Sequence, residues 1–262
     1  MGVLGIVAGG GPLPRLVAHA ATARGRPVFV LGFAGVTADE TRAGRMVPLG
    51  AVGEAMAALR AERVDEVVLA GPVPRPRLGD LRMDARAARL LGRVMFGRLG
   101  DDAALRAVIA EIEHEGMRVI GAHEAAPELL APLGRVGEVE ADEADLRDLE
   151  AGIEGCRQLG DAGQAVIVRD GRIVDREGPD GTDALLAGLG RGHGGVMVKL
   201  PKPGQDRRVD LPTIGPRTVE LAAAAGLRGL FVEADGTLLI DRAGISDTAD
   251  RNGLFVVGVG RP

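Results

Sequence analysis

Apolar runs of strand length alternate with segments of helical spacing in the first half of the chain, and this alternation is what most limits its fold. Val3 to Ala8 is a short apolar run that ends in Gly9-Gly10-Gly11, and apolar residues then recur at helical spacing up to Gly25. Further runs of the two kinds follow at 27–31, 52–59 and 66–70. Strands that alternate with helices predict a parallel sheet. We therefore expect an α/β fold whose amino-terminal domain contains a parallel sheet.

The second half mixes helical segments with hairpin signals. Asp142 precedes a helical segment that carries Leu146 and Cys156 on its apolar stripe, and Asp170-Gly171 lies between two apolar runs. We expect a hairpin at that dipeptide and another at Asp235-Gly236, because such pairs favour two-residue hairpin turns. Further strands are expected at 194–200, 227–232, 237–240 and 254–259, with a helix at 216–226. This half is therefore predicted to be a mixed α/β domain.

A stretch rich in proline, glycine and acidic residues between Glu124 and Glu143 separates the two halves. We place the domains at 1–132 and 133–262, with the catalytic residues in the second.

Composition excludes several classes of protein. The net charge is -5, and the chain has no Trp, no Tyr and only five Phe, which disfavours binding to nucleic acid. The single cysteine, Cys156, excludes an internal disulfide, and its place on an apolar stripe indicates a core residue rather than a nucleophile. We see no signal peptide and no run of about 18 apolar residues, the length of a membrane span. We expect a soluble, cytoplasmic protein.

Residues 199–215 combine four cations, two carboxylates and three prolines, more than the packing of a helix or strand requires. Lys199 and Lys202 are the only lysines among 32 Lys and Arg residues, which suggests that a compact ammonium is needed, with phosphate as its target. Asp210, just before Pro212 on an apolar bend, is a candidate metal ligand or base. The alternative is a surface loop joined by salt bridges.

Other candidates lie where predicted strands end, the edge at which open parallel sheets bind ligands. Gly10 and Gly11 form either an anion-binding loop or a tight turn, and Arg75 between prolines is a candidate phosphate ligand. Asp101 and Asp102 either cap a helix or contact a ligand. His123, followed by Glu124, is a candidate acid or base, a ligand contact or a structural residue.

An acidic group follows the first hairpin. Asp175, Glu177, Asp180 and Asp183 lie within nine residues. Carboxylates at this density either bind Mg²⁺ or Mn²⁺ or form a solvated loop in which Asp183 starts the next helix. The sequence does not decide between these two.

An ordered series of motifs from Gly5 nearly to the carboxyl terminus resembles the LpxI-type UDP-2,3-diacylglucosamine pyrophosphatases of lipid A biosynthesis. The series comprises Ala8-Gly9-Gly10-Gly11-x-Leu13-Pro14, Gly71-x-Val73-x-Arg75-Pro76, Gly100-Asp101-Asp102, Gly121-Ala122-His123-Glu124, Gly163-Gln164-Ala165, Gly181-Thr182-Asp183 and Lys202-Pro203-x-Gln205-x-x-x-Val209-Asp210-Leu211-Pro212-Thr213-Ile214-Gly215. The last string is the most specific.

The resemblance implies a Mg²⁺-dependent hydrolase that converts UDP-2,3-diacylglucosamine to UMP and 2,3-diacylglucosamine 1-phosphate (lipid X), with water attacking the sugar-side phosphorus. It further implies a Rossmann-like amino-terminal domain, a family-specific carboxyl-terminal domain with the lipid held between the two, a homodimer, and transient contact with the cytoplasmic face of the inner membrane.

The candidate site residues follow from the matched motifs together with the residue arguments above. The catalytic candidates are Asp210, Lys202 and Gln205, and the metal candidates are Asp210, Asp180 and Asp183. The substrate-binding candidates are Gly10, Gly11, Leu13, Arg75, Asp101, Asp102, His123, Gln164, Thr182, Lys199 and Thr213. One departure is visible, because the family's usual Glu-Gly-Thr-Asp reads Asp180-Gly181-Thr182-Asp183 here.

Two other functions compete with hydrolysis. A nucleotide-dependent oxidoreductase would use the glycine loop, but the loop lacks the G-x-G-x-x-G pattern and the acidic residue after the second strand. A non-catalytic nucleotide-sugar or lipid-binding protein would bind the same ligand and release no UMP.

Overall fold

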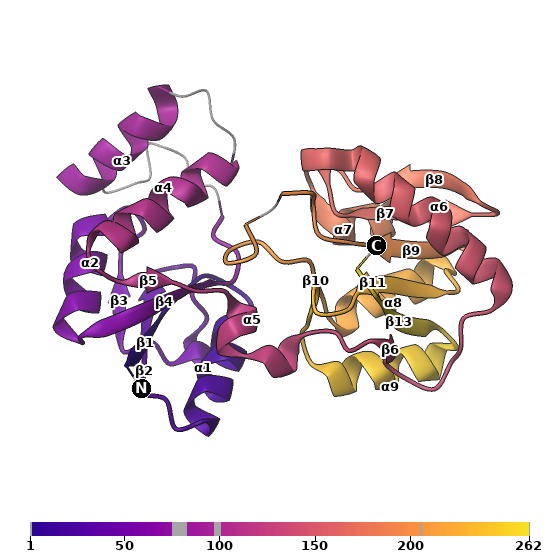
Figure 1. Ribbon diagram of the computed structural model, residues 1–262, viewed down its shortest axis with the longest axis horizontal. Helices are drawn as coiled ribbons and strands as arrows, with labels where there is room; N and C mark the ends of the chain where they lie inside the picture. Colours follow the sequence, from indigo (N-terminus) through magenta and orange to yellow (C-terminus); the bar gives the residue numbers. More distant parts are fainter. Residues whose placement is uncertain (1, 75–82, 97–100, 205, 262) are drawn as a thin grey trace. The chain divides into compact units, whose positions relative to one another are not determined.

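The computed structural model describes residues 2–74, 83–96, 101–204 and 206–261 (Figure 1). The chain forms two compact units. Unit 1 comprises residues 1–128 together with 207–209, and unit 2 comprises residues 129–206 and 210–262. The chain therefore leaves unit 1 near residue 128 and contributes three further residues to it from the lysine-containing segment.

Unit 1 contains a five-stranded sheet in the order β3-β2-β1-β4-β5, and every adjacent pair is parallel. Its elements are β1 (Val3–Ala8), α1 (Leu13–Ala23), β2 (Val28–Phe33), β3 (Arg45–Val47), α2 (Val52–Ala61), β4 (Val64–Ala70), α3 (Ala85–Phe96), α4 (Asp101–His114), β5 (Arg118–Val119) and α5 (Ala122–Ala125). The predicted parallel α/β domain is confirmed. The sequence did not predict β3 or α3.

The strand order puts the most apolar strands at the centre. Leu4 and Ile6 of β1 and Val67 and Val68 of β4 are fully buried, as expected for strands covered on both faces. Because the chain builds β2 and β3 on one side of β1 and then crosses to β4 on the other, the topological switch point lies at the carboxyl ends of β1 and β4.

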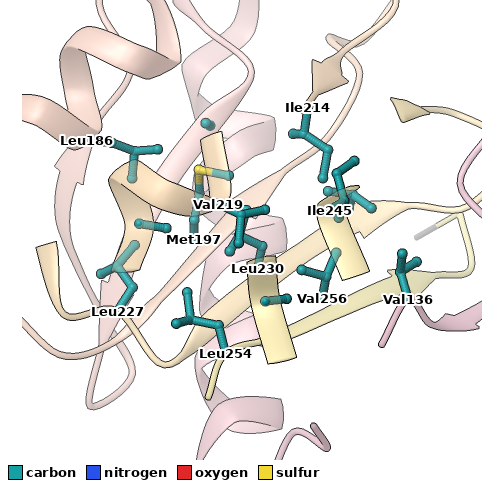
Figure 2. Packing of buried hydrophobic residues seen from close by; sticks show 14 of the residues in the cluster. Val136, Leu186, Met197, Ile214, Val219, Leu227, Leu230, Ile245, Leu254 and Val256 are labelled. Atoms are coloured by element: carbon teal, nitrogen blue, oxygen red, sulfur yellow. The ribbon is translucent and has the colours of Figure 1, made fainter. Parts of the chain in front are cut away.

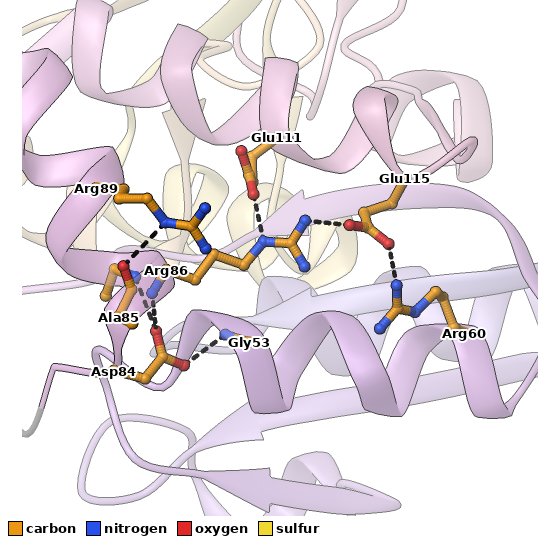
Figure 3. Close-up of polar contacts among 9 residues, drawn as sticks. Gly53, Arg60, Asp84, Ala85, Arg86, Arg89, Glu111 and Glu115 are labelled. Carbon is orange, nitrogen blue, oxygen red and sulfur yellow. Dashed lines mark hydrogen bonds and ion pairs between the residues drawn. The ribbon is translucent and has the colours of Figure 1, made fainter.

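Charged side chains hold α3 to its neighbours within unit 1 (Figure 3). Arg86 on α3 pairs with Glu111 on α4 and with Glu115 directly after α4, and Arg60 on α2 also pairs with Glu115, at 2.6 Å. Asp84 accepts the backbone N–H groups of Ala87, at 2.8 Å, and Gly53, at 2.6 Å, so it caps α3 and ties it to α2.

Unit 2 contains a six-stranded mixed sheet in the order β6-β13-β11-β9-β7-β8, in which β13, β11 and β9 are parallel and the other pairs antiparallel. Its elements are β6 (Gly134–Arg135), α6 (Glu143–Leu159), β7 (Ala165–Arg169), β8 (Arg172–Arg176), α7 (Gly181–Gly188), β9 (Val196–Lys199), β10 (Thr213–Ile214), α8 (Pro216–Ala225), β11 (Gly229–Glu233), β12 (Leu238–Leu239), α9 (Arg242–Asn252) and β13 (Phe255–Val259). The predicted mixed α/β half is confirmed, although α9 was not predicted.

The two faces of this sheet carry separate apolar clusters. Alternation along β9 sends Val196 and Val198 to the cluster that contains Phe231 and Phe255. Met197, between them, packs into the other cluster (Figure 2), whose members also come from α7, α8 and α9. The main sheet of unit 2 is thus buried on both faces.

Helix α6 confirms one sequence prediction and corrects another. Asp142 caps the helix, because its carboxylate accepts the N–H of Asp145, at 2.8 Å. Leu146, predicted to lie on the apolar stripe, is 49% exposed. Asp145 and Asp148 occupy the inward positions instead and pair with Arg228, which precedes β11. Two inward carboxylates that share one arginine thus replace apolar contact in the first turns.

The two hairpin predictions have opposite outcomes. The hairpin at Asp170-Gly171 is confirmed, and both residues have positive φ, 53° and 72°. The prediction of a hairpin at Asp235-Gly236 is wrong, because β12 pairs in parallel with β10 and forms a separate two-stranded sheet. Asp235 has φ of 55° but Gly236 is not left-handed, so the turn that needs positive φ at both positions does not form.

None of the helices in the part of the chain that the structure describes has the combination of length and apolar character needed to cross a membrane.

Candidate functional site

The predicted site residues fall into two groups, one on each unit, and each group lies near the carboxyl ends of parallel strands. In unit 1 these are the loops after β1, β4 and β5, and in unit 2 they are the residues around the end of β9. Each group is described on its own unit.

In unit 1, the glycine loop after β1 interlocks with the loop after β4. The N–H of Gly9 donates to the carbonyl of Ala70 and that of Gly10 to the carbonyl of Pro72, both at 2.8 Å. A Cβ at Gly9 would lie 2.4 Å from the Gly71 carbonyl oxygen, and Gly71 itself has φ of 84°. Only glycine permits this approach of two backbones.

This interlocking limits the donors that the loop can offer to an anion. The N–H groups of Gly9 and Gly10 are already used, and Pro12 and Pro14 at the start of α1 have none. By position, Leu13 and Arg15 are the first-turn residues whose N–H groups have no partner within the helix. The remaining donors are therefore Gly11 in the loop and Leu13 and Arg15 at the start of α1.

His123, the second residue of α5, has an imidazole nitrogen without a partner. Its ring lies against Gly121, where a Cβ would be 2.3 Å from Nδ1. This Nδ1 is buried and has no hydrogen-bond partner among the described residues. Burial lowers the pKa of His123, the charge of Arg207 lowers it further, and Glu124 opposes both. The imidazole is therefore predominantly neutral near pH 7, and a ligand atom could satisfy its nitrogen.

The neighbouring Glu124 has a structural role, because its carboxylate accepts the N–H of Gly121, at 2.8 Å, at the start of α5.

Three residues of the predicted lysine-rich segment belong to unit 1. Arg208 pairs with Glu113 on α4, at 3.0 Å, and Val209 packs against the apolar cluster that contains Ile109 and Val67. This return to unit 1 had no counterpart in the sequence analysis.

In unit 2, Lys199 at the end of β9 is 3% exposed and takes part in a hydrogen-bonded network. Its ammonium donates to the Thr182 hydroxyl, at 2.7 Å, and lies 3.7 Å from a Glu177 carboxylate oxygen. The Thr182 hydroxyl in turn donates to the same Glu177 oxygen, at 2.7 Å. The other Glu177 oxygen accepts the backbone N–H of Gln164, at 2.5 Å. The structure thus brings Lys199, Thr182 and Gln164 together, all three of them predicted site residues.

Burial and charge act against each other on this pair. Burial alone would raise the pKa of Glu177, but the Lys199 charge, the Thr182 hydroxyl and the Gln164 amide outweigh it and lower the pKa. Burial lowers the pKa of Lys199, and the charges of Glu177 and Asp210 oppose that effect. Because Thr182 and Gln164 both donate to Glu177, the carboxylate form is the one that fits, and we assign the pair as ionised.

Asp210, the predicted catalytic and metal-binding residue, is half-buried, and its backbone N–H donates to the Asp206 carbonyl, at 3.3 Å. Its charge raises the pKa of Lys199, against the larger effect of burial.

The four acidic residues after the first hairpin do not act as one group. Glu177 points into the Lys199 network, whereas Asp175, Asp180 and Asp183 are exposed. Helix α7 begins at Gly181, before Asp183. Among the described residues, no group of three or more His, Cys, Asp or Glu side chains is placed to hold a metal ion.

The remaining predicted site residues are placed as follows. Lys202 is half-buried, and Thr213 is exposed on β10, where its hydroxyl donates to the Leu211 carbonyl, at 3.2 Å. Asp101 and Asp102 are the first residues of α4, so Asp101 lies inside the helix rather than before it, and their side chains are outside the described part. Arg75 and Gln205 lie outside the described residues.

Cys156 is a core residue, as predicted. It is 5% exposed, and burial raises the pKa of its thiol to about 12. A thiol that is protonated at neutral pH is a poor nucleophile, which fits its place in the core.

Two residues with a part in these groups were not identified from the sequence. Glu177 was considered only as one of four carboxylates that bind a metal ion or form a solvated loop, and its pairing with Lys199 depends on strand register. Thr37, after β2, donates its hydroxyl to the Ala8 carbonyl, at 2.5 Å, and so supports the end of β1 just before the glycine loop. No local pattern marks either residue.

The chain is similar to one family along nearly its whole length. The LpxI N-terminal domain matches residues 3–129, and the LpxI C-terminal domain matches residues 132–257. The UDP-2,3-diacylglucosamine pyrophosphatase LpxI of Caulobacter vibrioides is 40% identical over 272 aligned residues, which cover 98% of this chain and 97% of that protein.

Proposed function

Because the chain belongs to the LpxI family, as its two matched domains and its full-length relative show, we propose that it hydrolyses the pyrophosphate bond of UDP-2,3-diacylglucosamine in lipid A biosynthesis. The products would be UMP and 2,3-diacylglucosamine 1-phosphate. The observation that carries the proposal is the family match over nearly all of both units. The Lys199 ammonium and the Asp210 carboxylate supply chemistry that suits such a reaction.

The proposed reaction is a displacement at phosphorus. The oxygen of a water molecule bonds to the sugar-side phosphorus, the bond from that phosphorus to the bridging oxygen breaks, and the bridging oxygen leaves with UMP. The chain must orient the water and offset negative charge on the phosphates. Asp210 is the residue we assign to the water, since a carboxylate can accept its proton or fix its orientation. Lys199 and Lys202 are the ammonium groups nearest to it in sequence.

A Mg²⁺ requirement is part of the proposal. Mg²⁺ is commonly held by one or two carboxylates together with substrate phosphate oxygens and water. Asp210 fits this pattern, because a single half-buried carboxylate is sufficient when the diphosphate supplies other ligands. Asp180 and Asp183 would be further ligands, although both are exposed. A bound ion would neutralise charge on the diphosphate, and Mn²⁺ has similar ligand preferences.

The resemblance also supports a cytoplasmic homodimer that meets its lipid substrate, and releases lipid X, at the inner membrane surface. We propose these partners and this location together with the metal ion.

Turnover by an Asp210→Asn variant tests the assignment. We expect the variant to release UMP from UDP-2,3-diacylglucosamine about 10²–10⁴-fold more slowly than the wild type, because the proton acceptor is removed while shape is kept. Asp247→Asn on the exposed surface of α9 makes the same chemical change and should leave turnover as it is. Chelation of divalent ions should stop the wild type, and added Mg²⁺ should restore it.

Several results would contradict the proposal. Intact substrate after incubation with the wild-type protein and Mg²⁺ would exclude hydrolysis and leave a binding function. Wild-type turnover by Asp210→Asn would show that Asp210 has no role in the reaction. Full activity in the presence of chelator would show that the reaction needs no metal ion.

A further inference from the structure

Lys199, Ala165 and Glu177 form one row across three segments of unit 2. Ala165 on β7 lies directly opposite Lys199 on β9. The N–H of Glu177 donates to the Ala165 carbonyl, at 2.9 Å, which extends the β7–β8 pairing one residue beyond Arg176. Residues opposite one another on neighbouring strands point to the same face of a sheet. The side chains of Lys199 and Glu177 therefore flank the methyl group of Ala165 on one face.

This row allows the two charges to meet. The backbones of Lys199 and Glu177 are two strands apart, about 10 Å. Ala165 is fully buried and too short to separate the longer side chains, which approach to 3.7 Å above it. The row is thus suited to one lysine and one glutamate at its ends.

A β-bulge in the hairpin determines which residue faces Lys199. Val168 pairs with Ile173 but Ile167 pairs with Asp175, so Val174 is left without a partner in the ladder. In a regular ladder counted from the Asp170-Gly171 turn, Arg176 would lie opposite Ala165. The bulge shifts the pairing by one residue, so that Glu177 lies there instead. The bulge thus places the Glu177 carboxylate, and not the Arg176 guanidinium, beside the Lys199 ammonium. Bulges are known to redirect side chains in this way.

Thr182 connects the two charges. A threonine hydroxyl has one proton to donate, and here that proton goes to Glu177 while the oxygen accepts from Lys199. In this arrangement the hydroxyl has no proton for a substrate phosphate. The Thr182 hydroxyl, a predicted substrate contact, thus links Glu177 to Lys199.

We propose that Glu177 is a positioning residue for the hydrolytic site, which acts through Thr182 to fix the Lys199 ammonium at the end of β9. The inference deepens the proposed function and rests on it, because Lys199 is one of the two ammonium groups considered there for offsetting charge on the phosphates. Without the Glu177 charge the ammonium loses its anionic partner at 3.7 Å and is no longer held in one place. It would then offset charge on the phosphates less well in the transition state.

The two lysines of the chain make a direct test possible in the full-length protein. Selective ¹³C labelling of lysine ε-carbons gives NMR signals from Lys199 and Lys202 alone. In Glu177→Gln we expect the Lys199 signal to move or broaden more than that of Lys202. We also expect kcat for UMP release to fall about 10- to 100-fold, as when a partner behind a functional group is removed. KM should stay within about twofold, since the lost interaction serves the transition state.

Matched variants separate positioning from general damage. Glu154→Gln makes the same substitution on the exposed surface of α6 and should change neither the Lys199 signal nor kcat. Thr182→Val removes the connecting hydroxyl without leaving a buried charge unpaired, and should reproduce the effects of Glu177→Gln. Thr182→Ser keeps the hydroxyl and should restore both readouts. If Glu177→Gln does not fold, the Thr182 pair carries the same test.

Each contrary result has a distinct meaning. An unmoved Lys199 signal in Glu177→Gln or Thr182→Val would overturn the inference, and so would an unchanged kcat. A raised KM with unchanged kcat would overturn it too, because the pair would then serve ground-state binding. Absence of UMP release by the wild type would instead overturn the proposed function, and the positioning role with it.

Discussion

At the scale of single residues, adjacent glycines of the loop after β1 differ in what limits their size. A Cβ at Gly9 would meet two backbone oxygens, those of Gly71 and Pro72, at 2.4 and 2.6 Å. Backbone atoms cannot rotate away as the end of a side chain can. A Cβ at Gly10 would have its nearest neighbour at 3.5 Å, which is ordinary contact. Gly9 is thus required by the fold of unit 1, whereas Gly10 has room for a methyl group.

Alanine at the two positions should separate fold from ligand contact. We expect Gly9→Ala to lower the free energy of unfolding by about 1–3 kcal/mol, because the interlocked loops must move apart. Gly10→Ala should change it by less than about 0.5 kcal/mol. If the substrate approaches this loop, Gly10→Ala should still raise KM for UDP-2,3-diacylglucosamine. Denaturant unfolding followed by circular dichroism, together with UMP release, measures both. Equal stability of the two variants would show that the loops are not tightly interlocked.

At the scale of elements, α3 is held to its neighbours by charge in the part that the structure describes. Burial alone would raise the pKa of Asp84, but the backbone N–H groups of Ala87, Gly53 and Arg86 outweigh it and lower the pKa. Arg86 lowers the pKa of Glu115 through a hydrogen bond, more than burial raises it. A carboxylate whose pKa is lowered in the folded state stabilises that state above its ordinary pKa. This contribution is lost as the pH falls through the folded-state value.

The Arg86 contacts should therefore have a defined pH dependence. We expect Arg86→Met to destabilise the protein by about 2 kcal/mol near neutral pH, where Glu111 and Glu115 lose their partner. The difference from wild type should shrink as the pH falls below 4.5, the ordinary pKa of glutamate, because protonated carboxyls no longer pair with arginine. Hydrogen exchange of the α3 and α4 amides between pH 7 and 3 measures this directly. A difference that stays constant with pH would show that Arg86 acts through packing alone. Arg89→Met is the matched control, because the Arg89 guanidinium donates to the Ala85 carbonyl, at 3.2 Å, within α3 itself.

At the scale of the whole molecule, the main sheet of each unit could be predicted from the sequence because strand and helix periodicity is a local signal. The apolar runs that became β1, β4, β9 and β13 are buried on both faces and easy to identify. Strand β3 has three residues, two of them exposed, and α9 is polar along most of its length, so neither has a clear pattern. Whether Asp235-Gly236 forms a hairpin turn depends on the φ of Gly236, and the frequency of the dipeptide in turns does not determine that angle.

The candidate site was predictable to a different extent. The charge density of residues 199–215 indicated the Lys199 region, and the family resemblance supplied the roles. The pairing of Lys199 with Glu177 was not predictable, because it depends on a bulge several residues away that changes the register. Likewise, no periodicity indicates that residues 207–209 belong with unit 1. The register between distant strands and the assignment of residues 207–209 to unit 1 are features of the tertiary structure. A sequence pattern that repeats over a few residues does not encode them.

The division into two units predicts how the chain responds to damage in one core. Leu59 and Leu230 are fully buried, the first in unit 1 and the second in unit 2. Leucine-to-alanine changes in such positions cost about 3–5 kcal/mol. Because each unit has its own apolar clusters, Leu59→Ala should lose hydrogen-exchange protection in unit 1 and Leu230→Ala in unit 2. The chain has no Trp or Tyr, so exchange read by mass spectrometry is better suited than intrinsic fluorescence. Loss of protection in both units from either substitution would mean that the units unfold as one, which the segment at 207–209 could enforce by joining unit 2 back to unit 1.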